Sequence, residues 1–271
     1  MVEMMRIGIP KEQNKNETRV AIVPVSIPKL MKLGFDVIIE KGAGEKSGYS
    51  DSEYEEKGAK IGNLESVMGA ELVASIDIPD FKIMKKGQML ACMADSFRNL
   101  KETKEIIDAG ITLLSLEVIP RRLSKGQSMD VNSSQDNLSG YRAALMGSQH
   151  ISKMVPMMMT SAGTVRPAKF IVQGAAVAGL QAIATAKRLG AIVQAIDVRL
   201  AAKQDTESLG AKFIDVPGWK DAESSSGHAS LFTDKELQEA FDKALMDAVK
   251  NADVVITTAR LFGTNAPKLF F

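Results

Sequence analysis

The sequence predicts an α/β protein built from two Rossmann-like domains, each a doubly wound parallel sheet, with the second domain incomplete at its C-terminal end. Three observations support this fold class. Short apolar runs alternate with amphipathic stretches, glycines stand where helices end and strands begin, and the alternation restarts after a polar segment in the middle of the chain. Strands that alternate with helices are typical of parallel sheets covered by helices on both faces.

The first half of the chain contains five apolar runs that we interpret as strands. Helical patterns near residues 27–33 and 100–109 lie between them. Gly34 and Gly110 each stand between a helical pattern and the following strand, where a glycine favours the end of a helix. The five runs are RIGIP, DVIIE, ELVASI, QMLACM and ITLLSL.

A polar segment begins near residue 127 and passes into a helical pattern capped around Ser133 to Asp136. We interpret this helix as the link between the two domains. The first domain is therefore expected at residues 1–141 and the second at residues 142–271.

The second domain repeats the strand and helix alternation but stops early. Its runs are the strand KFIVQ, the helix AGLQAIATAKRLG, the strands AIVQAID and AKFID, a helix near residues 235–251 and the strand ADVVITT. A complete doubly wound dinucleotide domain has about six strands, and only four are visible here. Either the domain is naturally short or the chain is a fragment.

The stretch VQGAAVAGL has the outline of a dinucleotide-binding turn. Gly174 and Gly179 occupy the first and third glycine positions, where they permit a tight turn and close packing of helix on strand. Ala176 replaces the middle glycine, and its methyl group is expected to weaken binding without abolishing it. A pyrophosphate would lie at the helix start, on Val177 and Ala178. The alternative is a Rossmann-like turn that holds no nucleotide.

Asp197 ends the second strand of this unit, where an acid can accept both ribose hydroxyls of an adenosine and repel a 2′-phosphate. NAD(H) is therefore favoured over NADP(H). Val198 and Arg199 follow it. Arg199 can favour the phosphate instead, but strand alternation puts it on the same side as Asp197, where the two side chains are expected to pair.

Composition excludes several classes of function. The 34 basic and 33 acidic residues give a formal net charge of +1, so we expect no nucleic-acid partner. The single cysteine, Cys92, lies in an apolar run and is interpreted as a small buried hydrophobe. No run approaches the roughly 20 apolar residues of a membrane helix. We also expect no metal site.

Several segments together resemble the NAD(H)-binding domain of the α subunit of proton-translocating nicotinamide nucleotide transhydrogenases, with alanine dehydrogenase as the nearest relative. The resemblance implies hydride transfer from NADH to NADP⁺ held on a separate NADP(H)-binding domain, the β subunit. It also implies a membrane-spanning proton channel domain as a partner and a homodimer. The segments are PKEQNKNETRVAIVP, KLGFDVIIEKGAG, RLSKGQSMDVNSSQDNLSGYRA, PMMMTSAGTVRPAK and GLQAIATAKRLGAIVQAIDVR.

The resemblance also implies the site and the location. A loop of the first domain, carrying Arg122, Gln127 and Asp130, would reach over the nicotinamide as positioning groups. The domain would be soluble and peripherally attached to a membrane complex, on the cytoplasmic side of a bacterial inner membrane or in the mitochondrial matrix. Further residues expected beside the cofactor are Ser133, Ser134, Gln135 and, in a mobile loop, Gly227 and His228.

Departures from the family pattern leave two other functions open. The family usually has tyrosine where His228 stands, and this histidine either stacks on the adenosine side or is exposed. Together with Ala176 and the short C-terminal end, it motivates a degenerate member that keeps the fold as a scaffold. Alanine dehydrogenases carry a lysine where this chain has Ser75, which argues against oxidation of an amino acid.

Overall fold

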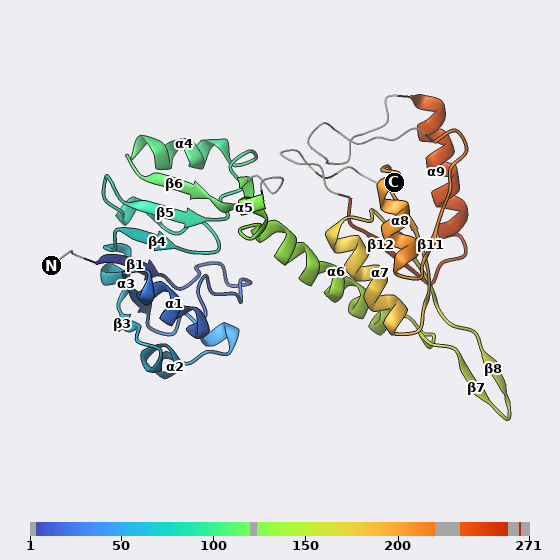
Figure 1. The fold of residues 1–271 in the computed structure, drawn as a ribbon, viewed down its shortest axis with the longest axis horizontal. Coiled ribbons are helices and arrows are strands. Elements are labelled where there is room, and N and C mark those ends of the chain that lie inside the picture. Colours follow the sequence, from blue (N-terminus) through green and yellow to red (C-terminus); the bar gives the residue numbers. More distant parts are fainter. Residues whose placement is uncertain (1–3, 120–123, 220–233, 260–265, 267–271) are drawn as a thin grey trace. The chain divides into compact units, whose positions relative to one another are not determined.

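The computed structural model describes residues 4–119, 124–219, 234–259 and 266 (Figure 1). The chain forms two compact units, Met1–Asp130 and Val131–Phe271. Each unit has its own parallel sheet, which confirms the predicted fold class. The domain boundary expected at residues 141 and 142 falls inside a long helix, α6 (Val131–His150), whose residues group with the second unit.

The first unit is built on a six-stranded sheet with the strand order β3-β2-β1-β4-β5-β6, and each pair of neighbours is parallel. The order reverses between β1 and β4, as in a doubly wound fold. Five of the strands correspond to the five predicted runs. The strands are β1 (Met5–Ile9), β2 (Phe35–Glu40), β3 (Lys60–Gly62), β4 (Leu72–Ala74), β5 (Met89–Cys92) and β6 (Thr112–Ser115).

Helices of the first unit begin and end at local signals in the sequence. Ser50 and Glu53 form a reciprocal capping box at the start of α2, and the Asn63 side chain caps α3. Gly34 and Gly110 adopt positive φ angles of 88° and 75°, as expected for the glycines that follow α1 and α4. The helices are α1 (Ile27–Lys32), α2 (Asp51–Glu56), α3 (Leu64–Met68), α4 (Leu100–Asp108) and α5 (Ser124–Gln127), with 3₁₀ turns at Pro24–Ser26, Glu45–Ser47, Phe81–Ile83 and Leu116–Val118.

The first unit is held together by two apolar clusters. One packs Ile9, Val37 and Tyr54 around the strands β1 and β2, and the other packs Leu90 and Ile106 around β5 and α4. Tyr54 is fully buried, and its hydroxyl donates a hydrogen bond of 2.9 Å to the carbonyl oxygen of Ile22.

The second unit contains a four-stranded parallel sheet with the order β11-β10-β9-β12. All four predicted strands are present, and the order reverses between β9 and β12. Apolar clusters cover both faces, with Phe170 and Val172 on the α7 side and Ile171 with Phe241 on the α9 side. The strands are β9 (Lys169–Gln173), β10 (Ile192–Ile196), β11 (Lys212–Phe213) and β12 (Val254–Thr257), and the helices are α6, α7 (Val177–Arg188), α8 (Ala201–Ser208) and α9 (Lys235–Val249).

A hairpin of β7 (Met158–Thr160) and β8 (Gly163–Val165) extends from the second unit as a separate antiparallel pair (Figure 1). Every residue of both strands is exposed, including Met159 at 71%. An isolated two-stranded hairpin is only marginally stable in water, so this exposed apolar surface is a candidate contact for another chain.

Helix α6 begins two residues before the capped position that the sequence predicts. The Ser134 hydroxyl donates to the Val131 carbonyl oxygen at 2.9 Å, so it makes a bond inside the helix and does not cap it. Ser133, Ser134 and Gln135 therefore lie in the first turns of α6. Within the described residues, no helix combines the length and the apolar character needed to cross a bilayer.

Candidate functional site

The turn between β9 and α7 depends on Gly174. Its φ angle is 92°, in the left-handed region that side chains disfavour. A Cβ atom added there would lie 2.7 Å from the Thr258 hydroxyl oxygen and 3.1 Å from the Ala259 amide nitrogen. The first glycine of the motif is thus required both by the backbone conformation and by the close approach of the chain after β12.

Gly179 is required by packing alone. A Cβ atom at this position would lie 1.8 Å from the Gly174 carbonyl oxygen, far inside van der Waals contact. Because Gly179 lacks that atom, the first turn of α7 lies directly against the turn that precedes it. The third glycine therefore has the role that the motif predicts, close packing of helix on strand.

Ala176 is the residue before the first turn of α7, and its backbone is extended, with φ −86° and ψ −164°. Any residue adopts this conformation, so the middle position of the motif does not need a glycine for backbone reasons. Ala176 is exposed, and Val177 and Ala178 are partly exposed. No side chain caps the start of α7, and its first turn contains no acidic residue. Uncapped amides at the positive end of a helix are suited to bind a phosphate or pyrophosphate.

Asp197 ties the turn to the end of β10. Its Oδ2 accepts hydrogen bonds from the Ala175 amide at 2.6 Å and from Nη2 of Arg199 at 3.0 Å, while its Oδ1 accepts from the Arg199 amide at 2.8 Å and from Nε at 3.0 Å. The pairing of Arg199 with Asp197, expected from strand alternation, is confirmed. Asp197 is 5% exposed, so in this structure its carboxylate faces protein donors.

Thr258 completes the turn, although no motif in the sequence indicates it. Its hydroxyl donates to the Gly174 carbonyl oxygen at 2.8 Å and lies 3.3 Å from the Gln173 carbonyl oxygen. It directly follows β12, on the far side of the point where the strand order reverses. A hydroxyl at the carboxyl end of the strand beside the turn is the signal that identifies it.

Trp219 is a second residue that sequence reasoning missed. Its indole Nε1 donates to the Val198 carbonyl oxygen at 3.3 Å, between Asp197 and Arg199. Its ring packs at 5.4 Å from the ring of Phe213. The only tryptophan of the chain therefore contacts the backbone at the end of β10 where the adenosine half of a dinucleotide is expected.

Helix α6 packs closely on the start of α7. A Cβ atom at Gly140 would lie 1.9 Å from the Ala178 carbonyl oxygen, and the Asn137 amide nitrogen donates to Oε1 of Gln181 at 3.2 Å. The helix that carries Ser133, Ser134 and Gln135 is thereby fixed against the helix that starts at the turn.

The remaining predicted site residues lie in the first unit or outside the described residues. Gln127 is the exposed last residue of α5, and its carbonyl oxygen accepts a hydrogen bond of 3.4 Å from the Asp130 amide. Arg122, Gly227 and His228 lie outside the described residues. Their proposed contacts with the cofactor stay predictions.

The model of the alanine dehydrogenase/PNT N-terminal domain matches residues 8–139, and the C-terminal model of the same family matches residues 143–271.

The chain belongs to the alanine dehydrogenase/PNT family.

Among known proteins, the chain is similar to an NAD(P) transhydrogenase subunit alpha of Rhodospirillum rubrum, with 42% identity over 98% of this chain and 72% of the relative. The crystal structure of transhydrogenase from Sinorhizobium meliloti matches with a TM-score of 0.87 and 40% identity, over 98% of this chain and 72% of that one. A structure of L-alanine dehydrogenase matches with a TM-score of 0.73 and 23% identity, over 93% and 65%, which shows a shared fold alone. These relatives support a transhydrogenase component.

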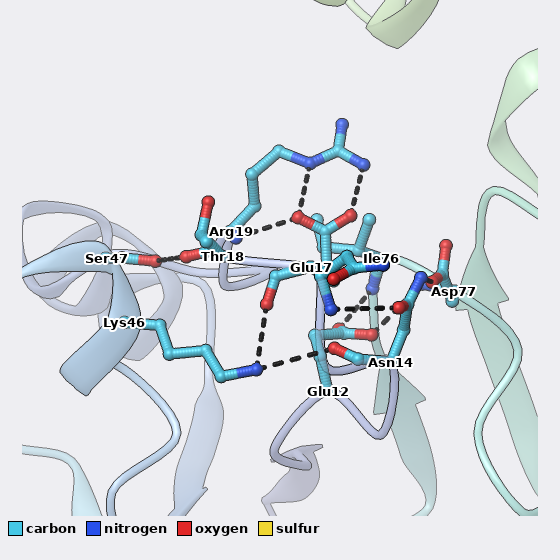
Figure 2. A network of polar contacts seen from close by, with 10 residues as sticks. Glu12, Asn14, Glu17, Thr18, Arg19, Lys46, Ser47, Ile76 and Asp77 are labelled. Atoms are coloured by element: carbon cyan, nitrogen blue, oxygen red, sulfur yellow. Dashed lines mark hydrogen bonds and ion pairs between the residues drawn. The ribbon is translucent and has the colours of Figure 1, made fainter.

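In this member of the alanine dehydrogenase/PNT family, a network of polar contacts joins the loop after β1 to the loop after β4 (Figure 2). The Glu12 carboxylate accepts hydrogen bonds from the amides of Ile76 at 2.7 Å and Asp77 at 3.2 Å. Burial raises the pKa of Glu12, against the opposing effect of these two bonds. Buried Ser75 donates to the Asp77 carbonyl oxygen at 2.6 Å. Ser75, which stands where alanine dehydrogenases are expected to carry lysine, thus stabilises the loop.

Two cations extend the network toward α2 (Figure 2). Arg19 binds the Glu17 carboxylate through Nε at 2.8 Å and Nη2 at 2.6 Å, and this contact lowers the pKa of Glu17. The Lys46 ammonium donates to the carbonyl oxygens of Lys15 and Glu17, each at 3.1 Å. The cations therefore bind groups of the same loop and hold it against the 3₁₀ turn that contains Lys46.

Cys92 is fully buried at the end of β5, and burial raises the pKa of its thiol to about 12. A thiol in this state is protonated at neutral pH and is a poor nucleophile. The interpretation of Cys92 as a small buried hydrophobe is confirmed.

Proposed function

We propose that this chain is the NAD(H)-binding component of a proton-translocating transhydrogenase and that it presents NADH to NADP⁺ on a partner domain. The observation that carries the proposal is the uncapped first turn of α7, which Gly174, Gly179 and Thr258 hold against the end of β9. The similarity to transhydrogenase α subunits supports the same conclusion.

The residues of the turn fit a dinucleotide because they provide backbone donors and little bulk. The amides of Val177, Ala178 and Gly179 would bind the pyrophosphate at the positive end of the helix. Asp197, with Val198 and Arg199, would lie at the adenosine half. The carboxylate at this position favours NAD(H) over NADP(H).

The remaining residues would orient the nicotinamide half. In this proposal Gln127 and Asp130 act with Arg122 above the ring, and Ser133, Ser134 and Gln135 line the site from α6. Gly227 and His228 would approach from the loop between β11 and α9. When bound, NAD(H) supplies the hydride. Hydride transfer between two nicotinamide rings needs no acid or base from the protein, so these residues act by positioning alone.

The proposed partners are the NADP(H)-binding β subunit, the membrane-spanning proton channel domain and a second copy of this chain. The exposed apolar side chains at the hairpin of β7 and β8, Met157, Met158, Met159 and Val165, support a contact between copies. The component would act beside the membrane complex, at the cytoplasmic face of a bacterial inner membrane or in the mitochondrial matrix. Sedimentation of Met159→Asp beside the parent tests the dimer, because a buried charge at this contact should yield monomers.

Two measurements test the catalytic proposal. Titration with NADH, followed by quenching of Trp219 fluorescence, should show saturable binding, with NADPH as the comparison. The chain mixed with an NADP(H)-binding domain should then reduce an NADP⁺ analogue in an NADH-dependent reaction. If turnover is absent with saturating cofactors, while the same partner domain is active with its own α subunit, the proposal is wrong.

The degenerate-member alternative loses one of its reasons. Ala176 is exposed on extended backbone and causes no strain in the turn. Restoring glycine at this position should therefore change NADH affinity only slightly. A large gain in affinity for Ala176→Gly would favour the scaffold interpretation.

A further inference from the structure

The carboxylate of Asp197 is fully engaged by protein donors. A carboxylate has about four lone-pair positions, and four donors occupy them here, three of which belong to Arg199. The two distances from its guanidinium, both 3.0 Å, describe a bidentate pair in which the positive charge faces the negative one. With side-chain exposures of 17% for Arg199 and 4% for Asp197, water screens this pair less than an exposed one.

This pairing changes what the acid does at the end of β10. An unpaired carboxylate there repels a 2′-phosphate and accepts the ribose hydroxyls, whereas an arginine there accommodates the phosphate. In this structure one residue pair contains both groups, and the net charge of the pair is zero. The acid therefore holds the Ala175 amide and the arginine in place, and the repulsion that excludes NADP(H) is largely cancelled.

We infer that Arg199 is a specificity-determining residue that limits the preference of this site for NADH over NADPH. The inference rests on the proposed function, since it assumes that the turn after β9 binds a dinucleotide. Paired with Asp197, Arg199 makes the preference smaller than the carboxylate alone would produce. Loss of the arginine charge should uncover the carboxylate and increase the preference.

The experiment compares the dissociation constants of NADH and NADPH in the full chain and three variants. Trp219 gives the signal in each case because its indole is hydrogen-bonded to Val198, beside the pair. Arg199→Met keeps much of the apolar stem but removes the charge, and it should raise the ratio of the NADPH constant to the NADH constant by about tenfold or more. Arg199→Lys keeps the charge and serves as the matched control, with a ratio close to that of the parent.

Asp197→Asn makes the opposite change and protects the test against a methionine variant that fails to fold. It removes the negative charge, keeps an oxygen for the Ala175 amide and leaves the arginine for the 2′-phosphate, so the ratio should fall below that of the parent. A ratio within about twofold of the parent in the methionine and asparagine variants would refute the inference, even if both affinities fall together. If the parent binds neither nucleotide, the proposed function itself is wrong and the inference falls with it.

Discussion

Replacing Gly179 by alanine should damage the turn severely, because the added methyl group would meet backbone. The new Cβ atom would lie 1.8 Å from the Gly174 carbonyl oxygen and 3.1 Å from the Thr258 hydroxyl oxygen. The helix and the turn must then separate by more than about 1 Å, and overpacking of this kind typically costs about 1–3 kcal/mol. The higher helix propensity of alanine offsets less than about 1 kcal/mol of that.

A matched control comes from another glycine inside a helix. At Gly147 of α6, the nearest atom to an added Cβ is a methyl carbon of Val254 at 2.6 Å, the end of a side chain that can rotate. The Gly147→Ala variant should therefore lose much less stability than Gly179→Ala. It should also keep NADH binding, since Gly147 lies far along α6 from the turn.

Trp219 fluorescence provides the assay, because the residue lies in the second unit and reports its unfolding. Urea unfolding of the parent and the two variants gives the free-energy differences, and NADH titration of each gives the effect on the turn. Equal stability of Gly179→Ala and the parent, with unchanged NADH affinity, would show that the turn moves freely and that the packing argument is wrong.

Three further predictions use other contacts. Thr258→Val should lower the free energy of unfolding of the second unit by about 1 kcal/mol, measured by urea unfolding, since the hydroxyl that donates to Gly174 is lost; no change would mean that water replaces the bond. Hydrogen bonds from Arg6 lower the pKa of Glu71 to about 2, so their stabilisation, about 0.2–1 kcal/mol for a half-exposed pair, is present above pH 4.5 and lost as the pH falls toward 2. The stability difference between the parent and Glu71→Gln should therefore shrink over that range, and a constant difference would contradict the assignment. Cys92 should react with a thiol reagent only after unfolding, and fast labelling of the native chain would refute its burial.

Most of the fold could be predicted from the sequence because the helices and strands have regular patterns and clear end signals. All four strands of the second sheet were predicted. Strand β3 was missed because it contains only Lys60 to Gly62, too short for an alternating pattern, and pairs through its backbone with β2. The hairpin of β7 and β8 was missed because its strands are exposed on both faces and show no alternation between apolar and polar residues.

The candidate site was predicted less completely, since its contacts depend on residues distant in the chain. The roles of Gly174 and Gly179 follow from the local motif. Thr258 reaches Gly174 from across the sheet, and no spacing in the sequence indicates this contact. The occupation of both Asp197 oxygens was also beyond the motif, because one donor comes from the turn itself.

The close approach of α6 to α7 defines which segments of the chain should unfold together. Gly140 lies against the Ala178 carbonyl oxygen, so opening of α6 requires loss of the packing that holds the start of α7. Segments that open together exchange their amide protons at a common rate. Hydrogen exchange should thus group the middle of α6 with α7 and β9, although in the sequence α6 directly follows the first unit. In folding terms, the long helix is the first element of the second cooperative unit.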